Sequence, residues 1–153
     1  MVFSSIIAYP FPFVEYFMKK RRFHIWLLLS CAWLIVIFGH SSMPAATSDA
    51  ESLGFLAVVQ TVFPWMTNHL LRKLGHFTEF LILGIFLTGT FRNAKNFTLF
   101  KPLGLCLLTA VCDETLQLFI AGRSGNLRDV WIDFAGAFFG TLLMWLIYKL
   151  RKR

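Results

Sequence analysis

The sequence predicts an all-α integral membrane protein, a bundle of four transmembrane helices with a short amphipathic helix in an outer loop. Composition is the first observation behind this prediction. Of the 153 residues, 57% are hydrophobic and 15% are charged, whereas soluble domains carry about 25% charged residues. The second observation is a set of four apolar stretches, each close to the ~20 residues with which a helix crosses a ~30 Å hydrocarbon core. The composition excludes an ordinary soluble enzyme, a disordered tail and a soluble repeat array.

The four apolar stretches are predicted to be helices because none of them alternates with a period of two, as a barrel strand would. A helix also satisfies its own backbone polar groups inside the bilayer. The stretches cover residues 23–39, 74–91, 103–120 and 130–150. A charged run precedes the first stretch and a poor cleavage site follows it, so we expect a retained helix rather than a cleaved signal peptide.

The basic residues predict the orientation of the chain. Three groups of them are cytoplasmic if both termini are, at residues 19–22, 92–101 and 149–153. The remaining four face outward: Arg72, Lys73, Arg123 and Arg128. This asymmetry satisfies the positive-inside rule. The formal net charge of +7 is therefore a signal of topology and of contact with anionic lipid heads, and nucleic acid is not an expected partner.

The N-terminal segment carries a separate expectation. Residues 1–17 are largely apolar, but Pro10 and Pro12 exclude one long helix there. Met18 directly precedes the charged run and resembles a natural start, so residues 1–17 are either an interfacial segment or an over-extended gene start. We therefore expect an extension over residues 1–17 and a single membrane domain over residues 18–153.

The long outer loop over residues 40–73 is expected to hold a short helix. Ser48 and Glu51 have the spacing of a capping box. Apolar residues then recur at helical spacing, at Leu53, Leu56, Val59 and Phe63. We expect an amphipathic helix that ends by Pro64 and lies at the outer surface or dips into it.

Ionisable and amide side chains from three of the predicted helices fall at one depth. At 1.5 Å per residue, they lie within about 10 Å of the outer boundary. Within each helix they also share a face, because their spacings are three, four or seven residues. Ionisable groups inside a bilayer are costly, which makes them candidates for function. The candidate catalytic residues are His76, Glu79, Asp113, Glu114 and Gln117.

A polar and small-residue stripe begins the last predicted helix. It consists of Asp129, Asp133, Gly136 and Gly140. The glycines would let another helix approach closely. We assign this stripe and Arg128 a structural or supporting role, and for Asp133 packing and function both stay open. The whole set of buried ionisable groups has one alternative explanation, a hydrogen-bonded network that only locks the helices together.

Three basic residues near the outer boundary are candidates for anion binding: Arg72, Lys73 and Arg123. The turn that holds Gly122 and Gly125 would let backbone amides point outward. The helix that follows presents the positive end of its dipole to the same layer, which favours a phosphate. A solvated hairpin explains the same turn, so both interpretations stay open.

Three motifs of the chain resemble those of the VanZ-like family. Residues 72–80 are similar to its K-x-x-H-F-x-E-Y segment, and residues 41–44 are similar to its S-S-x-P. Residues 113–140 resemble its long signature D-E-x-x-Q-x-F-x-x-G-R, followed by D-V-x-x-D/N-x-x-G-x-x-x-G. The resemblance spans residues 23–148, so the membrane domain over residues 18–153 is expected to be VanZ-like.

This resemblance implies a small protein of the bacterial cytoplasmic membrane with a role at the cell envelope. The family is named for a teicoplanin-resistance determinant, but most members belong to no resistance system, so an effect on glycopeptide susceptibility is the weaker implication. The chain departs from the family pattern at three positions. Phe80 replaces a frequent Tyr, Leu116 a frequent second His, and Ala121 a frequent Pro. Any mechanism that needs the second His therefore fails here.

We carry three hypotheses for function. The first is a protein that binds or modulates lipid-linked or surface-exposed anionic envelope components. Its basic residues would hold phosphate, while Asp113, Glu114 and Gln117 contact sugar or peptide groups. The second is an intramembrane enzyme of lipid head groups in which His76 acts as general base, oriented by Glu79 or by Asp113.

The third hypothesis is a proton-coupled transporter, which we favour least because the inner halves of the helices carry almost no charge. A divalent cation held by Asp113, Glu114 and Asp133 would serve the enzyme. We do not favour this cation, because three carboxylates and one His also fit many structural networks. The sequence predicts neither the substrate nor the oligomeric state.

Overall fold

A computed structural model describes residues 12–93 and 97–151 of the chain. These residues form five helices and no strand, which confirms the all-α prediction for the described part. The helices are α1 (Pro12–Ser41), α2 (Ala45–Gln60), α3 (Asn68–Asn93), α4 (Phe100–Gln117) and α5 (Leu127–Leu150).

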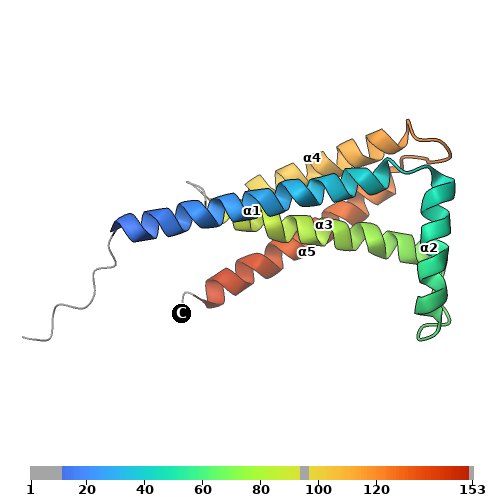
Figure 1. Ribbon diagram of the computed structural model, residues 1–153, viewed down its shortest axis with the longest axis horizontal. Coiled ribbons are helices and arrows are strands. Elements are labelled where there is room, and N and C mark those ends of the chain that lie inside the picture. The colour runs from blue at the N-terminus through green and yellow to red at the C-terminus, as the bar shows by residue number, and fades with distance from the viewer. Residues whose placement is uncertain (1–11, 94–96, 152–153) are drawn as a thin grey trace, which may run out of the picture.

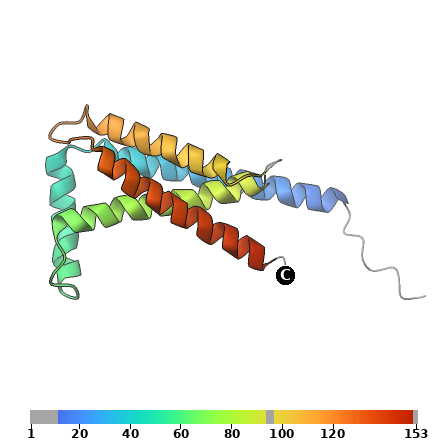
Figure 2. The same ribbon diagram turned by 180° about the vertical axis from the view of Figure 1, so that it is seen from behind.

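Four of the helices run lengthwise between the same two ends of a bundle, and α2 lies across one end (Figure 1). We call this the α2 end, and it also holds the turn between α4 and α5. The opposite end, the terminal end, holds the start of α1 and the end of α5, as the reverse view also shows (Figure 2). The start of α1 and the end of α5 thus lie on the same side of the bundle.

Three of the described helices are long and apolar enough to cross a membrane. They are Phe17–Ser41 within α1, Asn68–Asn93 and Leu127–Leu150. The helix α4 also runs the length of the bundle, but its 18 residues include Lys101, Asp113 and Glu114. The predicted count of four membrane spans is therefore not confirmed.

The helix α1 begins earlier than its apolar stretch predicts. Proline is well suited to the first turn of a helix, where its missing N–H would have no partner. Pro12 therefore begins α1 instead of interrupting it, and residues 12–17 continue into the long helix. Residues 1–11 lie outside the described part, so a separate extension there stays a prediction.

The outer-loop helix α2 exists, with a different start from the predicted one. It begins at Ala45 behind Pro44, with no side-chain cap, so Ser48 lies inside the helix and the capping-box prediction is wrong. It ends at Gln60, before Pro64, as predicted. Leu56 is its one buried residue among those described. The helix therefore leaves apolar surface uncovered, including Leu53, Phe55 and Val58.

The helices α3 and α5 cross in close contact, and small residues make this contact possible. A Cβ atom on Gly136 would overlap the carbonyl of Phe77, and one on Gly140 would overlap the carbonyl of Leu81. The prediction that the glycine stripe packs against another helix is confirmed. The apolar core lies around this crossing, with Phe80 as its largest fully buried side chain.

Candidate functional site

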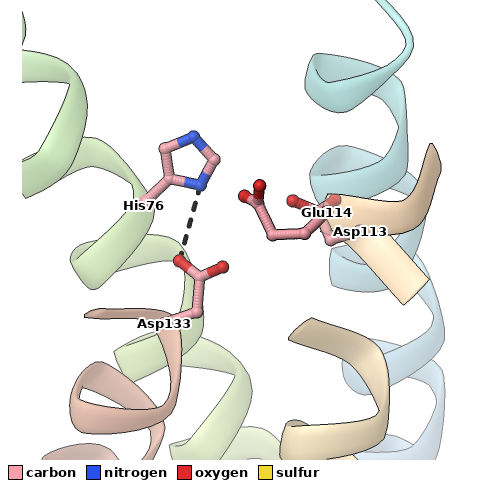
Figure 3. Close-up of side chains that lie close together, drawn as sticks. All are labelled: His76, Asp113, Glu114 and Asp133. Carbon is pink, nitrogen blue, oxygen red and sulfur yellow. Dashed lines mark ion pairs between the residues drawn. The ribbon is translucent and has the colours of Figure 1, made fainter. Parts of the chain in front are cut away.

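Four ionisable side chains from three helices meet at the α2 end of the bundle (Figure 3). His76 comes from α3, Asp113 and Glu114 from α4, and Asp133 from α5. One nitrogen or oxygen atom of each lies within 4.8 Å of the corresponding atoms of the others. We call these four residues the acid–histidine cluster. They meet because α3 and α5 begin at this end while α4 ends there. The helical turns that carry the four residues therefore lie at one depth in the bundle.

The two acids from α4 are held by hydrogen bonds. Ser41 donates to Asp113 Oδ1 at 2.5 Å, and Gln117 donates to Asp113 Oδ2 at 3.1 Å. The same Gln117 amide lies 3.3 Å from Glu114 Oε1, and the backbone N–H of Asn126 donates to Glu114 Oε2 at 2.8 Å. Asp113, Glu114 and Gln117 are all buried. Their orientation is therefore fixed by groups from α1, from α4 and from the turn before α5.

The other half of the cluster lacks such partners. His76 Nδ1 lies 3.4 Å from Asp133 Oδ1, as an ion pair if the ring is protonated. The geometry is not that of a hydrogen bond, since His76 Nδ1 and both carboxylate oxygens of Asp133 are buried without a hydrogen-bond partner among the described residues. The Asp133 side chain is completely buried. A buried polar group without a partner is costly, and a site of this kind needs an explanation.

A polar cavity of about 400 Å³ opens beside the cluster. His76 and Gln117 contribute to its lining, as do all three predicted anion-binding residues, Arg72, Lys73 and Arg123. The start of α2, the first turns of α3 and the turn before α5 surround it. The cavity therefore connects the basic residues with the histidine of the cluster.

The three predicted anion-binding residues in the lining already have partners. Arg72 forms an ion pair with Asp49 of α2, and Lys73 forms one with Asp129 of α5. Arg123 donates from Nε to the carbonyl of Met43 at 2.8 Å and from Nη2 to that of His40 at 2.9 Å. Burial lowers the pKa of Arg123, and the positive charge of Arg72 contributes to the shift. Arg123 thus joins the turn before α5 to the turn before α2.

The glycine turn has a use that the sequence did not predict. Gly122 adopts a φ of 74°, which glycine tolerates best. The N–H of Asn126 does not point outward, because it is bound to Glu114. The Asn126 side chain then caps α5 by accepting from the N–H of Arg128 at 3.0 Å. At this position the turn binds a carboxylate of the protein itself.

Two predicted polar site residues, Glu79 and Arg128, lie outside both the cluster and the lining of the larger cavity. Glu79 is one turn further along α3, and its carboxylate contacts His40 Nδ1 at 2.5 Å. Arg128 is exposed at the start of α5. Glu79 lines a second, smaller pocket of about 80 Å³ together with Arg72, His76 and Arg123, so the expectation that all the polar residues share one cavity stays a prediction. Asp129 belongs to the cavity lining, whereas Gly136 and Gly140 serve the contact with α3.

Sequence reasoning missed three residues that shape the site. They are His40, which binds Glu79, Ser41, which binds Asp113, and Asn126, which binds Glu114 and caps α5. The one available signal was the S-S-x-P motif, which includes Ser41 but suggests no role for it. His40 lies in the last turn of α1 and Asn126 in the turn before α5, and the partners of both are set by how the helices pack.

Long apolar helices and a buried cluster of ionisable groups at one end define the class of this protein as an α-helical membrane protein. Within this class, the chain belongs to the VanZ/LLP1 family, whose sequence model matches residues 26–148. The predicted resemblance is thereby confirmed over most of the chain. Comparison with curated proteins and with solved structures gave no match.

Proposed function

We propose that this protein binds the anionic head group of a lipid-linked cell-envelope component at the outer face of the bacterial cytoplasmic membrane. One observation carries the proposal. Arg72, Lys73 and Arg123 line a single cavity of about 400 Å³ that also reaches His76. Guanidinium and ammonium groups are the usual protein ligands of phosphate. The volume lies within the range of about 300–1,000 Å³ that is common for small-molecule sites.

The ion pairs in the lining set a condition on binding. Arg72 and Lys73 are neutralised by Asp49 and Asp129, so an arriving phosphate must share or replace these carboxylates. Such an exchange conserves the pairing of the cations, because one oxygen anion takes the place of another. It also favours a head group that carries further hydroxyl or amide groups, which Asp49 and Asp129 can then bind.

The proposed site requires a particular orientation in the membrane. We place the α2 end outside and both termini in the cytoplasm, following the positive-inside rule. We also propose α4 as a fourth span, since its 18 residues give a length of about 27 Å at 1.5 Å per residue. With this orientation, α2 lies along the outer surface, where its exposed Phe55 and Val58 contact lipid. A reporter fused after Arg153 that works only outside the cytoplasm would contradict the orientation.

The test compares two lipids that differ only in charge. Purified protein in nanodiscs is titrated with a polyprenyl phosphate and with the corresponding uncharged polyprenol, and binding is followed by native mass spectrometry. We expect the phosphate to bind at least tenfold more tightly. The variant Lys73→Gln should lose most of this preference. The matched control is Arg128→Gln, which removes one positive charge at the same end but outside the cavity lining.

Two results would contradict the proposal. One is equal binding of the two lipids. The other is an equal loss of affinity in Lys73→Gln and Arg128→Gln, since this would indicate general attraction to a basic surface. If the protein binds phosphatidylglycerol as tightly as polyprenyl phosphate, the ligand is not specifically a lipid-linked envelope component.

A second candidate function is catalysis on the bound head group. The observation in its favour is His76, which lines the same cavity and whose Nδ1 has no hydrogen-bond partner among the described residues. A neutral imidazole can take a proton from water or from a hydroxyl group. If this candidate is correct, a labelled lipid-linked substrate is turned over, and His76→Gln abolishes turnover while binding persists. Binding without turnover by the wild-type protein would leave only the first function.

A further inference from the structure

The acid–histidine cluster has the composition and spacing of a metal site. It offers three carboxylates and one imidazole from three helices, and three of its four residues are buried. Its ligand atoms lie within 4.8 Å of one another. Two ligands on opposite sides of an octahedral ion with bonds of 2.0–2.2 Å would lie about 4.0–4.4 Å apart. Side-chain movements of a few tenths of an ångström would therefore close the cluster around one ion.

The unpartnered atoms of the cluster point to a ligand. Both oxygens of Asp133 and Nδ1 of His76 are buried without a hydrogen-bond partner among the described residues, and they face the same centre as the other two acids (Figure 3). A metal ion would satisfy all three atoms at once, because carboxylate oxygens and neutral imidazole nitrogens are both metal ligands. A proton shared by His76 and Asp133 is the competing explanation. A shared proton would give a partner to fewer of these buried atoms, and it would not involve Asp113 or Glu114.

The remaining two acids are held as metal-binding carboxylates usually are. Ser41, Gln117 and the N–H of Asn126 donate hydrogen bonds to Asp113 and Glu114. Ligating carboxylates commonly receive such bonds, which fix their direction. Ser41 is thus a positioning residue, since it would act on the ion only through Asp113.

The charges around the cluster also favour a bound cation. The cations of the cavity lining are engaged elsewhere: Lys73 with Asp129, Arg72 with Asp49, and Arg123 with two backbone carbonyls. Three buried carboxylates therefore face one histidine. Buried charges are tolerated when they are paired or when they coordinate a metal.

We propose that His76, Asp113, Glu114 and Asp133 together bind one divalent transition-metal ion. Three oxygen ligands favour Mn²⁺, and the imidazole also admits Zn²⁺. This inference does not rest on the head-group proposal, because the four ligands need no lipid. If both are correct, the ion offers a phosphate a positive partner next to the cluster, in addition to the cavity cations.

The test measures binding of the metal alone. Full-length protein in detergent is treated with a chelator, transferred to phosphate-free buffer and titrated with Mn²⁺, and free Mn²⁺ is followed by electron paramagnetic resonance. We expect one Mn²⁺ per chain, displaced by Zn²⁺. Asp133→Asn and Glu114→Gln should each weaken binding at least tenfold, and Ser41→Ala should weaken it about tenfold. Glu79→Gln is the matched control, because it removes one carboxylate from α3 outside the cluster.

Several results would overturn the metal site. They include no stoichiometric binding of either ion by the wild-type protein, unchanged affinity in both Asp133→Asn and Glu114→Gln, and an equal loss in Glu79→Gln. If Asp133→Asn does not accumulate, Glu114→Gln decides the question, since its amide oxygen can still accept from Asn126. Mn²⁺ binding with no preference for polyprenyl phosphate would remove the head-group proposal and leave the metal site standing.

Discussion

The two halves of the bundle both bury polar side chains, but they differ in the kind of polar group and in its hydrogen-bond partners. Toward the terminal end, the buried groups are hydroxyls with partners inside the bundle. Thr88 donates to the carbonyl of Gly84 at 2.7 Å, and Ser30 donates to that of Trp26 at 2.8 Å while lying 3.2 Å from the hydroxyl of Thr90. Toward the α2 end, the buried groups include four carboxylates, and one of them, Asp133, has no hydrogen-bond partner among the described residues.

This difference separates structure from function. A threonine that bonds to its own helix satisfies its hydroxyl at little cost, so it belongs equally well in a purely structural bundle. A buried carboxylate without a partner weakens the fold, and it persists where something else uses it. The terminal half is therefore interpreted as scaffold and the α2 end as the site.

The largest effect is expected from overfilling the scaffold at the crossing of α3 and α5. Gly140→Leu would place a side chain where the carbonyl of Leu81 lies, and backbone cannot rotate away as a side chain can. We expect the free energy of unfolding to fall by about 3 kcal/mol, the upper end of the usual cost of overpacking, because the clash is with backbone. Thermal unfolding in detergent measures it. The control is Gly104→Leu on α4, where a Cβ meets nothing within 4 Å. Similar losses in the two variants would contradict the close crossing.

The second largest effect is expected at Arg123, which joins the two turns of the α2 end. Arg123→Ala removes two hydrogen bonds from a charged donor, so we expect a loss of about 1.5–3 kcal/mol. Arg123→Lys keeps the charge but not the planar donor geometry and should recover only part of the stability. Thermal unfolding of both variants checks this. Full stability of Arg123→Ala together with lost ligand binding would instead assign Arg123 to the ligand alone.

A smaller effect of opposite sign is expected at Asp133 when the protein is free of metal. Asp133→Asn removes a buried charge that has no hydrogen-bond partner among the described residues and has only the His76 ring as an ion-pair partner there, so stability in a chelating buffer should rise by about 1–2 kcal/mol. Thr88→Val, in the terminal half, should lower it by about 0.5–1 kcal/mol, since it deletes a satisfied hydroxyl. Denaturant titration gives both values. A large loss in Asp133→Asn would mean that Asp133 and His76 are a structural ion pair, and the comparison of the halves would fail.

The smallest effect is expected at the pair of Glu79 and His40. The His40 side chain is 56% exposed, and exposed ion pairs contribute about 0–1 kcal/mol. Glu79→Gln should therefore change stability by less than about 1 kcal/mol and leave head-group binding unchanged. Thermal unfolding and the lipid titration test this together. If Glu79→Gln lost as much lipid binding as Lys73→Gln, Glu79 would have to be counted among the residues that bind the head group.

The sequence predicted much of the site because depth along a helix is a local property. Residue spacing and a rise of 1.5 Å per residue fix how far a side chain lies from a helix end. His76, Asp113, Glu114 and Asp133 could therefore be assigned to one layer before any packing was known. Helix faces follow from the same spacing, which is why the glycine stripe of α5 was predicted to be a contact.

Other features escaped prediction because they depend on partners distant in the chain. Glu79 shares a face with His76, yet it pairs with His40, because α1 packs beside α3. Arg123 was assigned to an anion, whereas its guanidinium binds two backbone carbonyls, one from His40 at the end of α1 and one from Met43 in the turn before α2. Pro12 was interpreted as a helix breaker, although its effect depends on whether a helix begins there or passes through it.

The sequence by itself determined the class of protein, the family, the apolar helices and the depth of the polar residues. These follow from composition, motifs and helical spacing, which need no knowledge of how one helix lies against another. Only the tertiary structure decided that four of the polar residues form one cluster, that Glu79 pairs with His40 instead, and that Asp133 has no hydrogen-bond partner among the described residues. The physical reason is that two side chains interact only when they are close in space. Helix packing decides this closeness, and it brings together residues as far apart in the chain as Ser41 and Asp113.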